Sequence, residues 1–143
     1  MKRIVRLKRQ KGFTLLELLV VMVIIGLLVG YVAPKYFSQL GKSEVKAARA
    51  QLDAIATALD IYRLDMRYYP NQEQGLNALV NQPESETRWQ GPYLEKAVPL
   101  DPWSQPYVYR VPGEVAEYDL LSYGKDRQLG GEGENADIFY HQH

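Results

Sequence analysis

The chain of 143 residues contains no cysteine and only two histidines. Without cysteine it can form neither a disulfide nor a thiolate metal site, and a cysteine nucleophile is excluded. The two histidines, His141 and His143, have no packing pattern around them, which is typical of a solvated tail rather than of a general base or a metal ligand. No GxSxG, HExxH or phosphate-loop motif is present. The sequence therefore does not predict an enzyme.

An excess of charge of one sign is also lacking, because 17 Lys and Arg side chains balance 17 Asp and Glu side chains. A net charge of zero argues against a nucleic acid or another polyanion as partner. The balance is uneven along the chain, however. All six ionisable side chains in residues 1–12 are basic, so residues 13–143 carry 11 basic and 17 acidic side chains.

Residues 13–33 are apolar except for Thr14 and Glu17. A helix of about 20 apolar residues can cross a bilayer. The basic side chains before it favour a cytoplasmic N-terminus, which places Lys35 and the following residues across the membrane. A cleaved secretory signal is disfavoured, because its apolar core is about 7 to 15 residues long and Pro34 would follow the cut. We expect a retained anchor.

Residues 34–66 predict an amphipathic continuation of this helix. Apolar residues recur there at steps of three and four: Val45, Ala48, Leu52, Ile55, Leu59, Tyr62 and Met66. Such a stripe indicates a helix that buries one face against a domain. Pro34 and Gly41 are expected to interrupt or kink the helix.

Residues 67–143 predict a small α+β region. Asn71 is placed to cap a short helix through residue 80, with Gln74 at its third position. Residues 81–106 contain five prolines and predict loops ordered by aromatic side chains, namely Trp89, Tyr93 and Trp103. The segments 107–111 and 117–123 are rich in Tyr, Val and Leu, which is typical of an antiparallel hairpin. The predicted fold class is therefore α+β, with a long N-terminal helix packed on this small domain.

Glu17 is the most unusual residue of the apolar run. A carboxylate in the hydrocarbon core costs roughly 2.5 to 3.5 kcal/mol, so it usually has a partner or a function. One interpretation places Glu17 near the interface, where its side chain reaches water. The other begins with removal of the basic segment before Phe13. The new α-amino group would be a cation in the apolar layer, and Glu17 of a neighbouring copy could neutralise it.

Carboxylates and glycines gather in residues 122–138. The carboxylates are Asp126, Glu132, Glu134 and Asp137, and the glycines are Gly124, Gly130, Gly131 and Gly133. Glycines let a loop fold tightly enough to present carbonyl oxygens, and Ca²⁺ takes about 6 to 8 oxygen ligands. The spacing is not that of an EF-hand. On the residues alone, a solvated acidic loop and a calcium site are equally good interpretations.

The segment around Gly12, Phe13 and Glu17 resembles the class III signal of type IV pilins and pseudopilins. This resemblance implies cleavage by prepilin peptidase between Gly12 and Phe13, and N-methylation of Phe13. Motifs along nearly the whole chain resemble the major pseudopilins of the type II secretion system. They are Tyr69-Pro70, Glu73 to Leu76, Ala78 to Val80, Gly91 to Leu94, Asp101 to Trp103, Pro106-Tyr107, and Ser122 to Gly124 with Asp137-Ile138. The chain departs from that pattern at Ser104, where Gly is usual, and at Tyr123, where Leu is common.

The resemblance implies a type IV pilin-like fold and a structural subunit. It divides the chain into a cleaved leader (1–12), a membrane-spanning or filament-core helix (13–33), an amphipathic helix (34–66) and a periplasmic region (67–143). Copies would form a helical homopolymer, the periplasmic pseudopilus, which drives folded proteins across the outer membrane. Pro34 would let part of the helix unwind on assembly. The implied partners are prepilin peptidase, minor pseudopilins, the inner-membrane assembly platform and, indirectly, the secretin.

The same resemblance implies that Ca²⁺ binds in the C-terminal loop. Asp126 and Asp137 would supply side chains, and Tyr123 and Gln128 would supply carbonyl oxygens. Asn135 would be a further ligand, with Glu134 as its rival. In a chain without cysteine, the ion would stabilise the domain as a disulfide does elsewhere.

Three other functions are open. The first is a type IV pilin of a surface fibre, which usually carries a C-terminal disulfide. The second is a competence or minor pseudopilin, against which the acidic loop and Gln74 to Leu76 argue. The third is a membrane-anchored binding or enzymatic domain in the periplasm, which leaves Glu17 unexplained.

Overall fold

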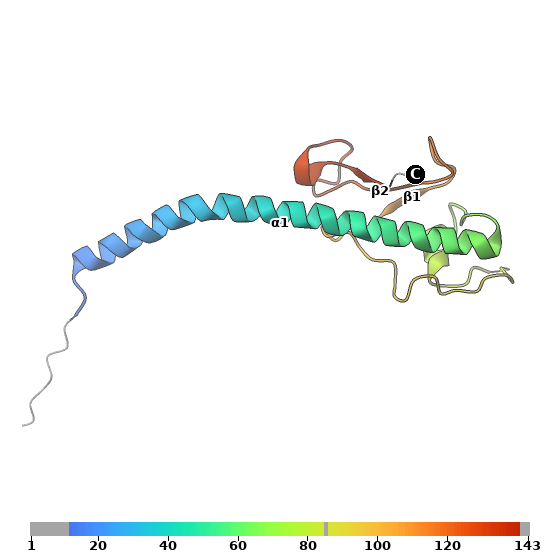
Figure 1. Ribbon diagram of the computed structural model, residues 1–143, viewed down its shortest axis with the longest axis horizontal. Coiled ribbons are helices and arrows are strands. Elements are labelled where there is room, and N and C mark those ends of the chain that lie inside the picture. The colour runs from blue at the N-terminus through green and yellow to red at the C-terminus, as the bar shows by residue number, and fades with distance from the viewer. Residues whose placement is uncertain (1–11, 85, 141–143) are drawn as a thin grey trace, which may run out of the picture. The chain divides into compact units, whose positions relative to one another are not determined.

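The computed structural model describes residues 12–84 and 86–140 (Figure 1). The predicted leader before Gly12 lies outside the described residues, as do His141 and His143. The elements are α1 (Leu15–Met66), the 3-10 helix η1 (Gly75–Leu79), β1 (Val108–Arg110), β2 (Asp119–Ser122), the 3-10 helix η2 (Gly133–Asn135) and β3 (Ile138–Phe139). The chain divides into two units, residues 1–38 and 39–143, and α1 belongs to both.

The described part of the first unit is almost entirely the apolar half of α1. Its large apolar side chains are all exposed, with exposed fractions between 49% at Val20 and 88% at Phe13. Among the described residues, α1 is the one helix that is long and apolar enough to cross a membrane.

The helix α1 runs without interruption through Pro34 and Gly41, so the interruption that these residues suggested does not occur. A proline inside a helix removes one backbone hydrogen bond and crowds the carbonyl four residues earlier. Helix formation is cooperative, and the long helical segments on both sides continue the structure past this one lost bond.

In the second unit, α1 buries the predicted apolar stripe. Six of its members are at most 1% exposed, namely Ala48, Leu52, Ile55, Leu59, Tyr62 and Met66. Val45 is partly buried and packs against this core. Leu76 and Leu79 of η1 and Tyr109, Leu120 and Ile138 of the sheet complete the same core. The α+β class is therefore confirmed.

The sheet has three antiparallel strands in the order β1-β2-β3. Tyr109 of β1 lies opposite Leu120 of β2, which confirms the predicted hairpin in a shorter form. Ser122 of β2 lies opposite Ile138 of β3. The sequence did not predict β3, because a strand of two residues is too short to show an alternating pattern.

The predicted short helix is realised only as η1. Asn71 and Gln74 do form a reciprocal pair: the Gln74 N–H donates to Asn71 Oδ1 at 2.8 Å, and the Asn71 N–H donates to Gln74 Oε1 at 3.0 Å. Gly75 then has a φ of 54°, which a right-handed helix does not allow. The first turn is therefore separated from the 3-10 helix that follows.

Aromatic side chains order the loop region as predicted. The Trp89 Nε1–H donates to the Ala78 carbonyl at 2.8 Å. Tyr93 lies edge-on to Trp89, with ring centroids 5.7 Å apart, and edge-on to Tyr62 of α1 at 5.4 Å. These contacts attach the loop to the core.

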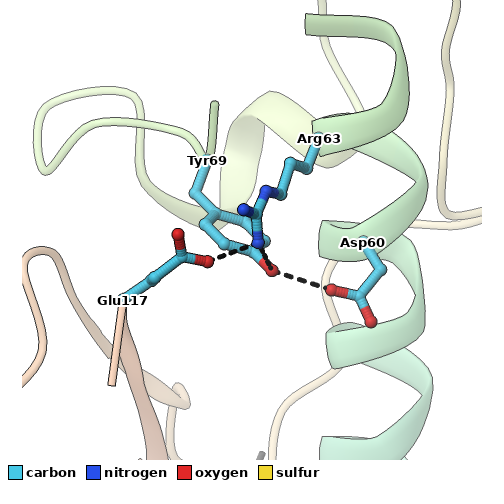
Figure 2. A network of polar contacts seen from close by, with 4 residues as sticks. All are labelled: Asp60, Arg63, Tyr69 and Glu117. Atoms are coloured by element: carbon cyan, nitrogen blue, oxygen red, sulfur yellow. Dashed lines mark hydrogen bonds and ion pairs between the residues drawn. The ribbon is translucent and has the colours of Figure 1, made fainter. Parts of the chain in front are cut away.

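A polar network ties the C-terminal end of α1 to the connection between β1 and β2 (Figure 2). The Tyr69 hydroxyl donates to Asp60 Oδ1 at 2.9 Å and accepts from Arg63 Nη1 at 3.2 Å. Arg63 also forms an ion pair with Glu117. The Arg63 and Glu117 side chains are 46% and 54% exposed, so this pair adds order more than stability.

Tyr62 gives a prediction about alkaline pH. Its hydroxyl is buried without a hydrogen-bond partner in the described part of the chain, and burial, with Glu86 nearby, raises the pKa of Tyr62 from 10.0 to about 12. Below pH 10, ionisation of Tyr62 therefore does not affect the free energy of unfolding, and this free energy falls as the pH rises from 10 toward 12, because the phenol ionises more easily in the unfolded chain. Tyr62→Phe should raise the free energy of unfolding by about 1 kcal/mol and reduce the alkaline loss. Thermal melting across this range, with Tyr36→Phe as the exposed control, checks it. An unchanged alkaline profile would contradict the prediction.

Candidate functional site

The predicted cleavage point is accessible. Gly12 and Phe13 precede α1 and are exposed. Among the described residues, no atom lies within 4 Å of a Cβ built on Gly12. The described part of the chain therefore does not require glycine at position 12 for steric reasons. If glycine is required here, the requirement comes from another molecule.

Glu17 takes part in a capping box at the start of α1. The Thr14 N–H donates to Glu17 Oε2 at 2.9 Å, and the Glu17 N–H donates to Thr14 Oγ1 at 3.2 Å. The carboxylate thus lies at the helix N-terminus, where the helix dipole favours a negative charge. Neither interpretation of Glu17 from the sequence included this partner within the same chain, although Thr-x-x-Glu before an apolar run is the signature of the box.

Lys35 lies at the other end of the apolar stretch. Its ammonium donates to the Tyr31 hydroxyl at 3.1 Å and lies 4.7 Å from the centre of the Tyr31 ring. At 1.5 Å per residue, Glu17 and Lys35 are about 27 Å apart along the helix, close to the ~30 Å of a hydrocarbon core. With this spacing, a helix that spans a membrane has Glu17 near one interface, whereas the pairing interpretation concerns the assembled state.

The acidic loop (residues 122–138) folds back on itself. The Gly130 N–H donates to Asp137 Oδ2 at 2.9 Å, and the Asp137 N–H donates to the Gly130 carbonyl at 3.2 Å. The Gln128 N–H donates to Asp126 Oδ1 at 3.1 Å. Positive φ angles make these turns possible, at Gly124, Arg127, Gly130, Gly131 and Gly133.

Two predicted ligand side chains of the loop have different environments. Asp137 Oδ1 is buried and has no hydrogen-bond partner in the described structure, whereas Asn135 is exposed. Glu134, the rival of Asn135, forms an ion pair with Lys125 at 2.7 Å, which raises the pKa of Lys125. Within residues 12–84 and 86–140, no three His, Cys, Asp or Glu side chains form a metal-binding group. A cation here would need carbonyl and amide oxygens as well.

A buried carboxylate that the sequence analysis missed supports the start of the acidic loop. Asp101 is 4% exposed, and its Oδ1 accepts the N–H groups of Trp103 at 3.0 Å and Gln105 at 2.8 Å. The Ser122 hydroxyl donates to Asp101 Oδ2 at 2.6 Å and accepts the Gly124 N–H at 3.2 Å. These bonds fix the backbone on both sides of Tyr123. Asp before Pro in a proline-rich loop is the available signal, since aspartate commonly bonds the backbone two residues on.

A long apolar N-terminal helix that begins in a capping box and carries a small α+β region on its second half defines a type IV pilin-like subunit. The family model described as "Type II secretion system (T2SS), protein G" matches residues 35–141, and the one described as "Prokaryotic N-terminal methylation motif" matches residues 7–33. The chain belongs to the type II secretion system protein G family.

The relatives agree with this assignment. The chain is 42% identical over 134 residues to the type II secretion system core protein G of Pseudomonas aeruginosa, with 92% of this chain and 94% of that protein covered. It is 41% identical over 136 residues to that of Vibrio cholerae, covering 93% and 92%. The crystal structure of the major pseudopilin from the type 2 secretion system of enterohaemorrhagic Escherichia coli matches with a TM-score of 0.59 and 33% identity, covering 72% of this chain and 90% of that one.

These similarities confirm the fold and the main functional interpretation. The chain is a major pseudopilin, a membrane-associated structural subunit that assembles into a pseudopilus with other components of the secretion system, and it is not an enzyme. Neither the surface-fibre pilin nor the anchored binding domain is favoured by any of them.

Proposed function

We propose that residues 1–12 are removed and that the mature chain polymerises into a periplasmic pseudopilus whose growth drives folded proteins across the outer membrane. Membership of the protein G family over most of the chain is the observation that supports this best. The exposed apolar side chains of α1 are available to contact neighbouring copies. Prepilin peptidase, minor pseudopilins and the assembly platform would be direct partners, and the secretin an indirect one.

The proposed topology is a single pass through the inner membrane, with the N-terminus in the cytoplasm and Lys35 and the following residues in the periplasm. The six basic side chains of residues 1–12 support this orientation. The Tyr31–Lys35 pair and the exposed Tyr36 are the aromatic and cationic groups expected at the outer headgroup layer.

We also propose that the acidic loop binds Ca²⁺. The loop fits a calcium ion because Asp137 Oδ1 is a buried oxygen without a partner, and because the turns hold Asp126 and Asp137 in one folded segment. Asp126, Asp137 and Asn135 would supply side-chain oxygens, and Tyr123 and Gln128 carbonyl oxygens. The engagement of Glu134 with Lys125 favours Asn135 over Glu134. When bound, the ion would neutralise the carboxylates and cross-link the loop.

Electron microscopy of the chain overexpressed with its peptidase and assembly platform tests the assembly proposal. Short filaments that contain the mature chain are the expected result. A processed chain that remains monomeric under these conditions would contradict it.

Gly12→Val should block leader removal almost completely while leaving the fold unchanged, because a side chain at Gly12 meets no atom of the described residues. Mass spectrometry of the N-terminus provides the measurement. Gly30→Ala, a change within α1 and beyond the cleavage motif, should be processed normally. N-methylated Phe13 in the Gly12→Val chain would disprove the cleavage site.

A further inference from the structure

Gly41 lies on the buried face of α1 directly under the side chain of Glu134. A Cβ built on Gly41 would stand 1.9 Å from Glu134 Oε1 and 2.4 Å from Glu134 Cγ. The end of the Glu134 side chain therefore lies against the glycine, and an alanine here displaces the Glu134 carboxylate from this position. Glycine inside a helix costs roughly 0.5 to 1 kcal/mol relative to alanine. The contact explains a glycine that was expected from the sequence to interrupt or kink the helix.

Glu134 is held in this place from within the acidic loop. Its carboxylate binds the Lys125 ammonium at 2.7 Å, and its carbonyl accepts the Lys125 N–H at 2.9 Å. Lys125 precedes Asp126, and Glu134 precedes Asn135. Lys125 and Glu134 are therefore the direct neighbours of two proposed calcium ligands, so displacing the Glu134 carboxylate removes an ion pair that holds the ligand segment together.

A second contact holds the same turn of α1. The Trp103 Nε1–H donates to Glu44 Oε2 at 3.1 Å. Trp103 lies two residues after Asp101, whose buried carboxylate binds Ser122 at the start of the acidic loop. Residues 41–44 of α1 thus make two contacts. Gly41 contacts Glu134 of the acidic loop, and Glu44 binds Trp103 in the turn that supports the start of this loop.

We infer that Glu134 is a positioning residue that docks the acidic loop on α1 at Gly41, and that calcium binding in the loop is linked through it to the helical conformation of residues 41–44. The inference rests on the proposed calcium site. By reciprocity, calcium protects this turn of the helix, and a helix distorted at Gly41 binds calcium more weakly. Glu134 therefore acts on the ion through the position of the loop and not as a ligand.

A double-mutant cycle with Gly41→Ala and Glu134→Ala in the full chain in detergent tests the linkage. Calcium titration calorimetry and hydrogen exchange of residues 39–46, with calcium and with chelator, are the two readouts. Gly41→Ala should weaken calcium binding about fivefold or more and remove the protection that calcium gives to residues 39–46. In the Glu134→Ala background, Gly41→Ala should have no further effect, because the clashing side chain is gone.

Gly26→Ala is the matched control, because it is the same change in α1 with no described atom within 4 Å of the new Cβ. It should leave calcium affinity unchanged. Calcium affinity equal to wild type in Gly41→Ala, or an equal loss with and without Glu134, would overturn the linkage while leaving the calcium site intact. A wild-type chain that binds no calcium would instead overturn the proposed site, and the linkage with it.

Discussion

Replacing Glu17 by alanine is expected to leave a subunit that inserts into the membrane but assembles poorly. In the single chain, Glu17 caps α1 through the Thr14 N–H, and losing a cap costs only about 1 kcal/mol. In the assembled state, the α-amino group of Phe13 on a neighbouring copy would lose its counter-charge. Truncating one member of a buried charge pair costs about 3 to 5 kcal/mol, and each ~1.4 kcal/mol is a factor of ten in association. Filament yield should therefore fall about a hundredfold or more, as counted by electron microscopy.

Glu17→Gln separates the two roles of the side chain. An amide oxygen can still accept the Thr14 N–H and cap the helix, but it cannot neutralise a cation. We expect this variant to insert normally and to assemble as poorly as Glu17→Ala. If Glu17→Gln formed filaments in normal yield, capping alone would explain Glu17 and the charge pairing would be refuted.

Removing calcium is expected to lower the melting temperature of the wild-type chain by roughly 10 to 20 °C. A ligand present at a hundred times its dissociation constant adds about 2.7 kcal/mol, and each kcal/mol shifts a domain of this size by about 4 to 8 °C. Asp137→Asn should abolish this calcium-dependent rise, because it removes the charge at the buried Oδ1. In chelator it should melt close to wild type, since an amide oxygen can still accept the Gly130 N–H.

Two other variants complete this series. Glu132→Ala removes an exposed carboxylate of the same loop and should keep the calcium-dependent rise. Asp137→Ala also loses the bond from Gly130, so it should melt lower even in chelator, by about 1 kcal/mol of stability. Equal melting temperatures of the wild-type chain in calcium and in chelator would contradict the proposed calcium site.

The helix was the most predictable part of the fold. Steps of three and four place Ala48, Leu52 and Ile55 on one face, and burial of that face follows from the period alone. The hairpin was predictable in place but not in length. The edge strand β3 was not predictable. Its two residues carry no strand pattern of their own, and they form a strand because they pair with β2.

The candidate sites divide in the same way. Gly12, Phe13 and Glu17 stand in one short motif, so the sequence alone is enough to predict them as site residues, and the Thr14–Glu17 box was predictable at that level too. The contact between Gly41 and Glu134 joins residues far apart in the chain, and no local pattern marks it. Asp101 was missed for a related reason, since its partner Ser122 lies on another element.

Because the apolar surface of α1 is exposed, contacts with lipid compete with contacts between copies during assembly. None of the apolar window of this helix is buried by the described residues, so lipid or other copies are the surroundings available to cover it. Hydrocarbon tails are as apolar as leucine, and exchanging them for neighbouring helices gains little from the hydrophobic effect. When this helix joins a filament, it moves from one apolar environment, the lipid, to another of nearly equal apolarity, the neighbouring helices. The few polar atoms at its ends, those of Thr14, Glu17 and Lys35, therefore have a disproportionate influence on the direction of the transfer.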